Sequence, residues 1–184
     1  MTEILKQVRE FADKAHGNQT RKYTPERYIV HPVRVMEICR QYTSSVPVLS
    51  AALLHDVLED TSVTKGEIYD FLSTIMSKED ALQTIELVVE LTDVYIKKAY
   101  PQWNRKTRKE KESNRIALTS PDAQTIKYAD IIDNSKEIVQ YDEDFGPKFL
   151  MECRNLLKRM NKGNPELYKL AIETVEQNLR REVD

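Results

Sequence analysis

Glycine, proline and cysteine are scarce in this chain of 184 residues. Its four glycines and seven prolines leave few positions that favour tight turns, so long helices are expected. No run of about 18 apolar residues occurs, and no membrane-spanning helix is expected. Residues 1–6 lack the basic and then apolar layout of a secretory signal peptide. Because Cys39 and Cys153 both have apolar helical neighbours, we expect reduced core cysteines in a cytoplasmic protein rather than a disulfide.

An excess of charge of one sign is also lacking. The 28 basic and 30 acidic residues give a net charge of −2 at pH 7. No overall positive field is available to hold nucleic acid, so no nucleic-acid partner is expected. The length fits a single domain, residues 1–184, that can bury a substantial core. Its motifs lie in about residues 1–140, and two C-terminal packing helices are expected in about residues 145–184.

Apolar residues recur at helical spacing throughout and predict an all-α fold, a compact multi-helix bundle. The first helix is expected to end at Gly17. A second is expected to begin near Pro32. A third is expected over about residues 46–59, and its run 49–54 is apolar on nearly every side, which predicts a central buried helix. Further helix starts are indicated by a capping box at Ser77-Lys78-Glu79-Asp80 and by Ser120-Pro121, Gly146-Pro147 and Asn164-Pro165.

Segment 54–60, with the sequence LHDVLED, places an aspartate directly after a histidine. On one continuous helix, Asp56, Glu59 and Asp60 share a face. Burying three carboxylates together costs free energy unless a cation or a proton offsets their charge. The acid pair would also lie at the C-terminal end of this helix, where it opposes the helix dipole. Both points favour a functional role for these acids.

Other candidate ligands lie upstream and downstream of this segment. His31, His55, Asp56 and Asp130 together offer two imidazoles and two carboxylates. This mixed nitrogen and oxygen set suits manganese, iron, zinc or a similar divalent ion, and ligand softness alone does not choose among them. Such an ion lowers the pKa of a bound water and polarises a phosphate. The sequence therefore indicates a metal centre suited to phosphate-ester hydrolysis.

These motifs resemble the HD-domain phosphohydrolases and, within them, the hydrolase domain of the RelA/SpoT homologues. The resemblance covers roughly residues 1–140 and implies a stand-alone small alarmone hydrolase. The matching stretches are Ala15-His16-Gly17-Asn18-Gln19-Thr20-Arg21-Lys22, Tyr28-Ile29-Val30-His31-Pro32, Ala51 to Thr61, Glu90-Leu91-Thr92-Asp93, and Ile126-Lys127-Tyr128-Ala129-Asp130 with Asn134.

The resemblance implies that His31, His55, Asp56 and Asp130 are the metal ligands and that the ion is usually Mn²⁺. The chain has three histidines and none after His55. HD proteins with two-metal sites recruit extra histidines beyond that pair, so a single ion is expected here.

With one ion, another group must activate the attacking water. The resemblance assigns this role to the acid pair, with Glu59 as the base and Asp60 as its partner, or the reverse. It also places Arg21 and Lys22 near the substrate phosphates, where arginine can bind bidentately and lysine acts as a point charge. Asn134 is expected close to the nucleotide.

Two further substrate contacts are predicted less directly. Tyr28 precedes a candidate ligand and is expected either to stack on a base or only to pack. The stretch 104–115 carries six basic residues. It reads as a solvated helix face that can also lend Arg108 or Lys109 to the far phosphates. This stretch has no interleaved aromatic residues beyond Trp103, which gives little support for nucleic-acid binding.

The leading functional hypothesis is metal-dependent removal of the 3′-pyrophosphate from guanosine tetra- or pentaphosphate, (p)ppGpp, to give GDP or GTP and pyrophosphate. A second hypothesis keeps the site and changes the nucleotide, to an adenosine alarmone or to NADPH with loss of its 2′-phosphate. A third is a non-catalytic HD module that binds a nucleotide or a partner protein. The intact acid pair after the HD motif weighs against the third hypothesis, and the sequence leaves oligomeric state open.

Overall fold

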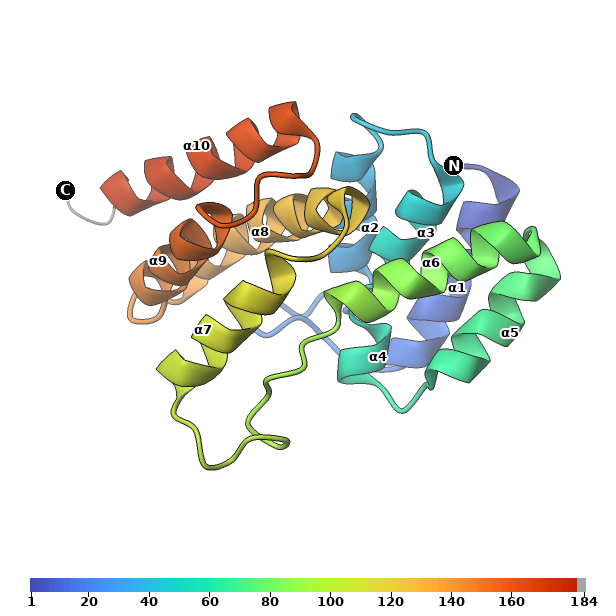
Figure 1. The fold of residues 1–184 in the computed structure, drawn as a ribbon, viewed down its shortest axis with the longest axis horizontal. Coiled ribbons are helices and arrows are strands. Elements are labelled where there is room, and N and C mark those ends of the chain that lie inside the picture. Colours follow the sequence, from blue (N-terminus) through green and yellow to red (C-terminus); the bar gives the residue numbers. More distant parts are fainter. Residues whose placement is uncertain (182–184) are drawn as a thin grey trace. The chain divides into compact units, whose positions relative to one another are not determined.

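The computed structural model describes residues 1–181. These residues form two units, residues 1–92 (unit 1) and the described residues from 93 onward (unit 2), and each is described by itself. The regular structure of the described residues is helical, apart from one isolated bridge between Thr20 and Arg27. The predicted all-α fold is confirmed (Figure 1). No helix among these residues is long and apolar enough to cross a membrane.

Unit 1 is built around α3, which packs against α1, α2 and α6 (Figure 1). Every residue of α3 from Pro47 to Leu54 is buried, so the predicted central buried helix is confirmed. The helices α5 and α6 pack against each other, and α4 contacts α1. The helices of unit 1 are α1 (Glu3–His16), α2 (Val30–Cys39), α3 (Val46–Leu54), α4 (Val57–Asp60), α5 (Lys65–Ile75) and α6 (Lys78–Leu91).

The ends of these helices follow local sequence signals. Gly17 ends α1 with φ of 57°, a left-handed conformation that glycine adopts without a steric penalty. The reciprocal capping box of unit 1 lies at Thr64 and Glu67, at the start of α5. Ser77 does cap α6 by accepting from the Asp80 N–H, but its hydroxyl donates to the short Asp80 side chain. The box predicted at Ser77 is therefore wrong, although the helix start is confirmed.

The predicted continuous helix over residues 46–59 is also wrong. Helix α3 ends at Leu54, and the four-residue α4 begins at Val57. Between them, Asp56 has φ of −96° and ψ of −6°, which lies outside regular helical geometry. Glu59 and Asp60 consequently belong to the first turn of α4, not to the end of a long helix. The helix-dipole argument for a functional acid pair does not hold.

Unit 2 contains the long helix α8, against which α9 and α10 pack, while α7 contacts α9 (Figure 1). Its helices are α7 (Arg105–Ile116), α8 (Pro121–Tyr141), α9 (Gly146–Leu157) and α10 (Pro165–Arg181). The helix starts predicted near Pro121, Pro147 and Pro165 are confirmed, with proline in the first turn of each. Cys153 in this unit and Cys39 in unit 1 are buried and reduced, as predicted.

Candidate functional site

Two histidines and an aspartate of unit 1 come together where the chain passes between helices. His31 lies in the first turn of α2, and His55 and Asp56 form the break between α3 and α4. One potential ligand atom from each residue lies within 4.8 Å of the others. The exposed fractions of the two histidines are 1% and 4%, and that of the Asp56 side chain is 21%. Three of the four predicted metal ligands are therefore neighbours.

The hydrogen bonding of this cluster fits a cation. His55 Nδ1 lies 2.8 Å from the carbonyl oxygen of Ala52, so Nδ1 must carry the proton that this contact requires. In a neutral ring, His55 Nε2 then has a lone pair, and it faces Asp56 Oδ2 at 3.1 Å. His31 Nε2 lies 3.6 Å from the same oxygen. Lone pairs that converge in this way require a proton or a metal ion between them, and the backbone contact is typical of histidines that bind metals.

Tyr28 links the cluster to the following acids. Its hydroxyl lies 2.7 Å from Asp56 Oδ2 and 2.9 Å from Asp60 Oδ2. The single hydroxyl proton can serve only one of these oxygens at a time. Burial of the hydroxyl, and next the charges of Asp56 and Asp60, raise the pKa of Tyr28. The phenol therefore stays protonated and donates to one of the two carboxylates at a time, Asp56 or Asp60.

Asp60 is less acidic than an ordinary aspartate. Burial, and next the charge of Asp56, raise the pKa of Asp60. Its backbone N–H donates to the Asp56 carbonyl at 2.9 Å, so the two acids remain one helical turn apart despite the helix break. The neighbouring Glu59, predicted to be the base, lies exposed on α4. Glu59 and Asp60 are thus both exposed residues of α4, and the Asp60 carboxylate lies within hydrogen-bond distance of the Tyr28 hydroxyl.

Two neighbours of these acids were not predicted as site residues. The buried His16 ring stacks on Tyr28, with ring centroids 4.4 Å apart, and His16 Nδ1 lies 2.9 Å from Gln19 Oε1. Gln19 in turn donates to the backbone carbonyl of Asp60 at 2.8 Å. The only available sequence signal was their place in the motif that precedes Arg21. His16 therefore packs against the Tyr28 ring, and Gln19 ties the end of α4 to the segment after α1.

The predicted phosphate-binding pair lies in the irregular segment before α2. The Arg21 side chain is over the Tyr28 ring, with its central guanidinium carbon 5.5 Å from the centroid. Arg21 is therefore near the metal cluster through Tyr28. Lys22 lies over the Tyr23 ring and donates to its hydroxyl at 2.7 Å. The Tyr28 ring already stacks on His16. Stacking of Tyr28 on a substrate base stays a prediction.

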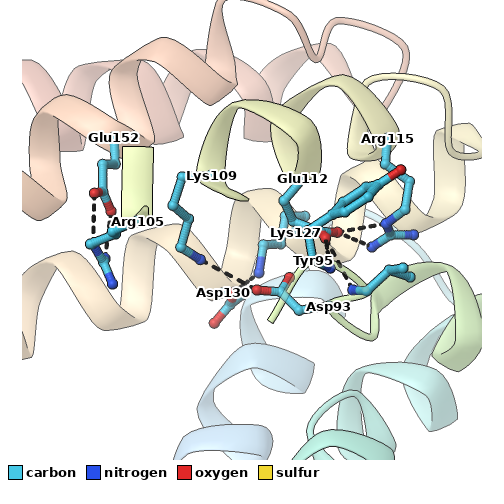
Figure 2. A network of polar contacts seen from close by, with 10 residues as sticks. Asp93, Tyr95, Arg105, Lys109, Glu112, Arg115, Lys127, Asp130 and Glu152 are labelled. Atoms are coloured by element: carbon cyan, nitrogen blue, oxygen red, sulfur yellow. Dashed lines mark hydrogen bonds and ion pairs between the residues drawn. The ribbon is translucent and has the colours of Figure 1, made fainter. Parts of the chain in front are cut away.

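The remaining predicted ligand, Asp130, belongs to α8 of unit 2. Both of its carboxylate oxygens accept hydrogen bonds from its own helix. Lys127 Nζ lies 2.8 Å from Oδ2 (Figure 2), and Asn134 Nδ2 lies 2.6 Å from Oδ1. A carboxylate has about four lone-pair sites, so these two hydrogen bonds do not by themselves prevent it from binding a metal ion. Asn134, predicted to contact the nucleotide, is thus placed to orient Asp130, and Lys127 is a partner that was not predicted.

Arg108, the last predicted substrate contact, lies on α7 in unit 2. Its guanidinium donates to the backbone carbonyl of Trp103. Lys109, the alternative contact, forms an ion pair with Asp93 at 3.3 Å (Figure 2). Both cations therefore hold the segment that leads into α7, and a role toward substrate phosphates stays a prediction.

Similar proteins support the resemblance seen in these motifs. A family model described as "HD domain" matches residues 9–144, most of the chain and parts of both units. The guanosine-3′,5′-bis(diphosphate) 3′-pyrophosphohydrolase of Aquifex aeolicus is 28% identical over 179 residues, which cover 96% of this chain and 23% of that protein. Its counterpart from Vibrio cholerae is 46% identical over 66 residues, 36% of this chain and 9% of that protein. The chain spans less than a quarter of the length of these two relatives.

A shorter relative matches over most of its length. Human MESH1, also named a guanosine-3′,5′-bis(diphosphate) 3′-pyrophosphohydrolase, is 33% identical over 138 residues, 73% of this chain and 69% of MESH1. A solved structure of a metazoan SpoT ortholog, described as hydrolysing ppGpp, has the same fold, with a TM-score of 0.78 at 23% identity. The match covers 97% of this chain and 98% of the other. The chain therefore belongs to the HD-domain family, among the relatives of MESH1.

Proposed function

We propose that this protein is a metal-dependent phosphohydrolase that removes the 3′-pyrophosphate of guanosine tetra- or pentaphosphate. The products are GDP or GTP and pyrophosphate. The observation that carries the proposal is the convergence of His31, His55 and Asp56, with the acids of α4 one turn away. The names of MESH1 and of the bacterial relatives support the choice of substrate.

The proposed metal ligands are His31, His55, Asp56 and Asp130, which would hold one divalent ion, with Mn²⁺ as the proposed identity. When bound, such an ion lowers the pKa of a water and withdraws charge from a phosphate. Asp130 comes from unit 2, whereas the other three ligands come from unit 1. We therefore propose that the two units act together as a single HD hydrolase domain, a proposal supported by the family match that spans both.

The acids of α4 are proposed to manage the protons of the reaction. Water adds to the phosphorus attached at ribose O3′, the bond from phosphorus to O3′ breaks, and O3′ gains a proton. We assign Glu59 as the base that takes the proton from water, as the resemblance implies, since it is an exposed acid on α4 next to Asp60. Asp60, held by the Tyr28 hydroxyl, is its proposed partner.

Substrate phosphates need positive charge beyond that of one ion. Arg21, near the cluster through Tyr28, and Lys22 are proposed to bind the phosphates. Asn134 and Tyr28 are proposed to lie beside the nucleotide, and Arg108 beside the far phosphates. The two buried, reduced cysteines support a cytoplasmic location.

The test is turnover of a nucleotide panel with and without added Mn²⁺. The panel contains guanosine tetraphosphate, its adenosine counterpart and NADPH. Release of GDP and pyrophosphate only with the metal supports the proposal. Cleavage of another panel member in place of guanosine tetraphosphate keeps the site and replaces the substrate. Absence of any turnover favours the non-catalytic binding module.

Glu59→Gln separates an enzyme from a binding module. The amide keeps the size of the side chain but cannot take a proton, so turnover should fall by about 100-fold or more, with metal binding retained. Asp70→Asn, on α5 outside the cluster, is the matched control and should leave turnover unchanged. Unchanged turnover in Glu59→Gln would reject the assignment of Glu59 as the base.

A further inference from the structure

A cluster of three aromatic rings lies in the segment before α7 in unit 2. The rings of Tyr100 and Trp103 are stacked, with centroids 4.6 Å apart and an interplanar angle of 9°. Tyr95 lies 5.1 Å from Tyr100 and 6.0 Å from Trp103. The three side chains are partly exposed. The sequence alone associated only Trp103 with the basic stretch, whereas the structure adds two more rings.

The same segment concentrates positive charge. Residues 94–111 contain seven lysines and arginines and a single acidic residue, although the whole chain has a net charge of −2. The residues Lys97, Lys98, Lys106 and Lys111 are exposed. Lys111 Nζ lies 5.9 Å from the centroid of the Trp103 ring, within the range of a cation–π contact. We call residues 94–111 the aromatic–basic surface.

A buried carboxylate fixes the start of this surface. Glu112 on α7 is 5% exposed. Its Oε2 accepts from the backbone N–H groups of Val94 and Tyr95, at 3.0 and 2.9 Å, and its Oε1 accepts from Arg115 (Figure 2). A carboxylate with three donors is held firmly. The backbone that carries Tyr95 is thereby tied to α7.

Other cations of the segment also hold its shape. Arg105 makes a bidentate pair with Glu152 of α9, at 3.0 and 2.7 Å (Figure 2). Lys109 pairs with Asp93 at 3.3 Å, and Arg108 donates to the Trp103 carbonyl. The rings and the exposed lysines are therefore presented on an ordered segment, which reduces the entropy that a ligand must remove on binding.

We propose that the aromatic–basic surface binds single-stranded nucleic acid. Aromatic rings stack on bases of any sequence, and neighbouring cations follow the phosphates of the strand. Helix α7, with 12 residues, is about 18 Å long at about 1.5 Å per residue. That length exceeds what a single nucleotide needs. The net charge of the whole chain argues against nucleic-acid binding, but that value hides the excess of positive charge in residues 94–111.

Trp103 makes the proposal directly testable, because it is the only tryptophan in the chain. An oligouridylate of about 12 nucleotides should quench its intrinsic fluorescence if bases stack on the cluster. A labelled copy of the oligonucleotide gives the affinity by fluorescence anisotropy. With four exposed lysines in contact with phosphates, log K should fall against log salt with a slope near −3.

Two variants and one matched control define the surface. Tyr100→Ala should weaken binding by about 5- to 150-fold, the range for loss of one stacking ring, whereas Tyr100→Phe should retain most of it. Lys97→Glu with Lys98→Glu should abolish quenching and lower the salt slope. Lys6→Glu with Lys14→Glu, on α1 of unit 1, makes the same change in net charge and should leave binding unchanged.

Several results would overturn the proposal. The first is that the oligonucleotide changes neither the fluorescence nor the anisotropy. The second is that the α1 control loses as much binding as the lysine variant. The third is that inorganic polyphosphate binds as tightly as the oligonucleotide and that Tyr100→Ala does not change the affinity for either. Binding to anionic lipid vesicles but not to the oligonucleotide would equally overturn it. Far-ultraviolet circular dichroism checks the fold of each variant. Lys97 and Lys98 lie at exposed loop positions, so their substitution tests the proposal even if Tyr100→Ala does not fold. None of these readouts depends on the proposed hydrolase activity.

Discussion

Tyr28→Phe tests whether the phenol hydroxyl organises the metal cluster. The substitution removes one oxygen, which lies 2.7 Å from Asp56 Oδ2 and 2.9 Å from Asp60 Oδ2. The ring remains, so its stacking on His16 at 4.4 Å is preserved. One hydroxyl proton is lost, and therefore one hydrogen bond to a charged acceptor at a time, which is worth about 1.5–3 kcal/mol when shielded from water. The Asp56 side chain is 21% exposed, so water replaces part of the loss and about 1 kcal/mol of stability is expected.

Function should respond more strongly than stability. Groups that orient a metal ligand typically change metal affinity by about 10- to 100-fold when removed. We expect Tyr28→Phe to weaken Mn²⁺ binding by about 10-fold in isothermal titration calorimetry and to lower turnover at saturating Mn²⁺. Tyr69→Phe, on α5, is the matched control and should change neither quantity. If Tyr28→Phe binds Mn²⁺ as tightly as the parent and turns over normally, the hydroxyl does not organise the site.

Three further predictions concern the stability of the two units. Gly163→Ala should destabilise unit 2 by about 1–3 kcal/mol, measured by urea unfolding, because its Cβ would lie 2.6 Å from a Tyr128 ring carbon and 2.8 Å from the Thr125 backbone nitrogen; unchanged stability would show that these neighbours can move. Thr64→Ala removes the N-cap of α5 and should cost about 1 kcal/mol, visible as a lower urea midpoint. Hydrogen bonds from the Thr64 backbone N–H, and next from its hydroxyl, lower the pKa of Glu67 below 4.5. Ionised Glu67 therefore stabilises α5 above pH 4.5, and the contribution should fade as the pH drops through its folded-state pKa; a Glu67→Gln variant should show a flatter pH dependence in that range.

The sequence predicted those parts of the fold that depend on local chemistry. Gly17 ends α1, and Ser120 with Pro121 begins α8, because each acts on the backbone within a few residues of itself. The box predicted at Ser77 failed since Asp80 is one methylene shorter than the glutamate that the motif prefers. Signals of this kind say little about contacts between distant residues.

Partners that are distant in sequence could be predicted only where a motif marked them. The clustering of His31 with His55 followed from the HD motif and is found in the structure. The contact from Gln19 to Asp60 spans 41 positions, and no spacing rule predicts it. The three-ring cluster of Tyr95, Tyr100 and Trp103 lies in a segment without regular periodicity, so no sequence pattern predicted that those rings would meet.

The helix break at His55 and Asp56 is the part of the site that periodicity could not predict, and it has a chemical consequence. On a continuous α-helix, adjacent side chains point about 100° apart and do not face each other. Here His55 Nε2 and Asp56 Oδ2 lie 3.1 Å apart, and His31 Nε2 lies 3.6 Å from the same oxygen. The interruption between α3 and α4 is what allows two consecutive residues to converge. The apolar run of α3 favours continuing the helix, so the break opposes the local hydrophobic pattern, and such a conflict between local preference and structure is typical of a functional site.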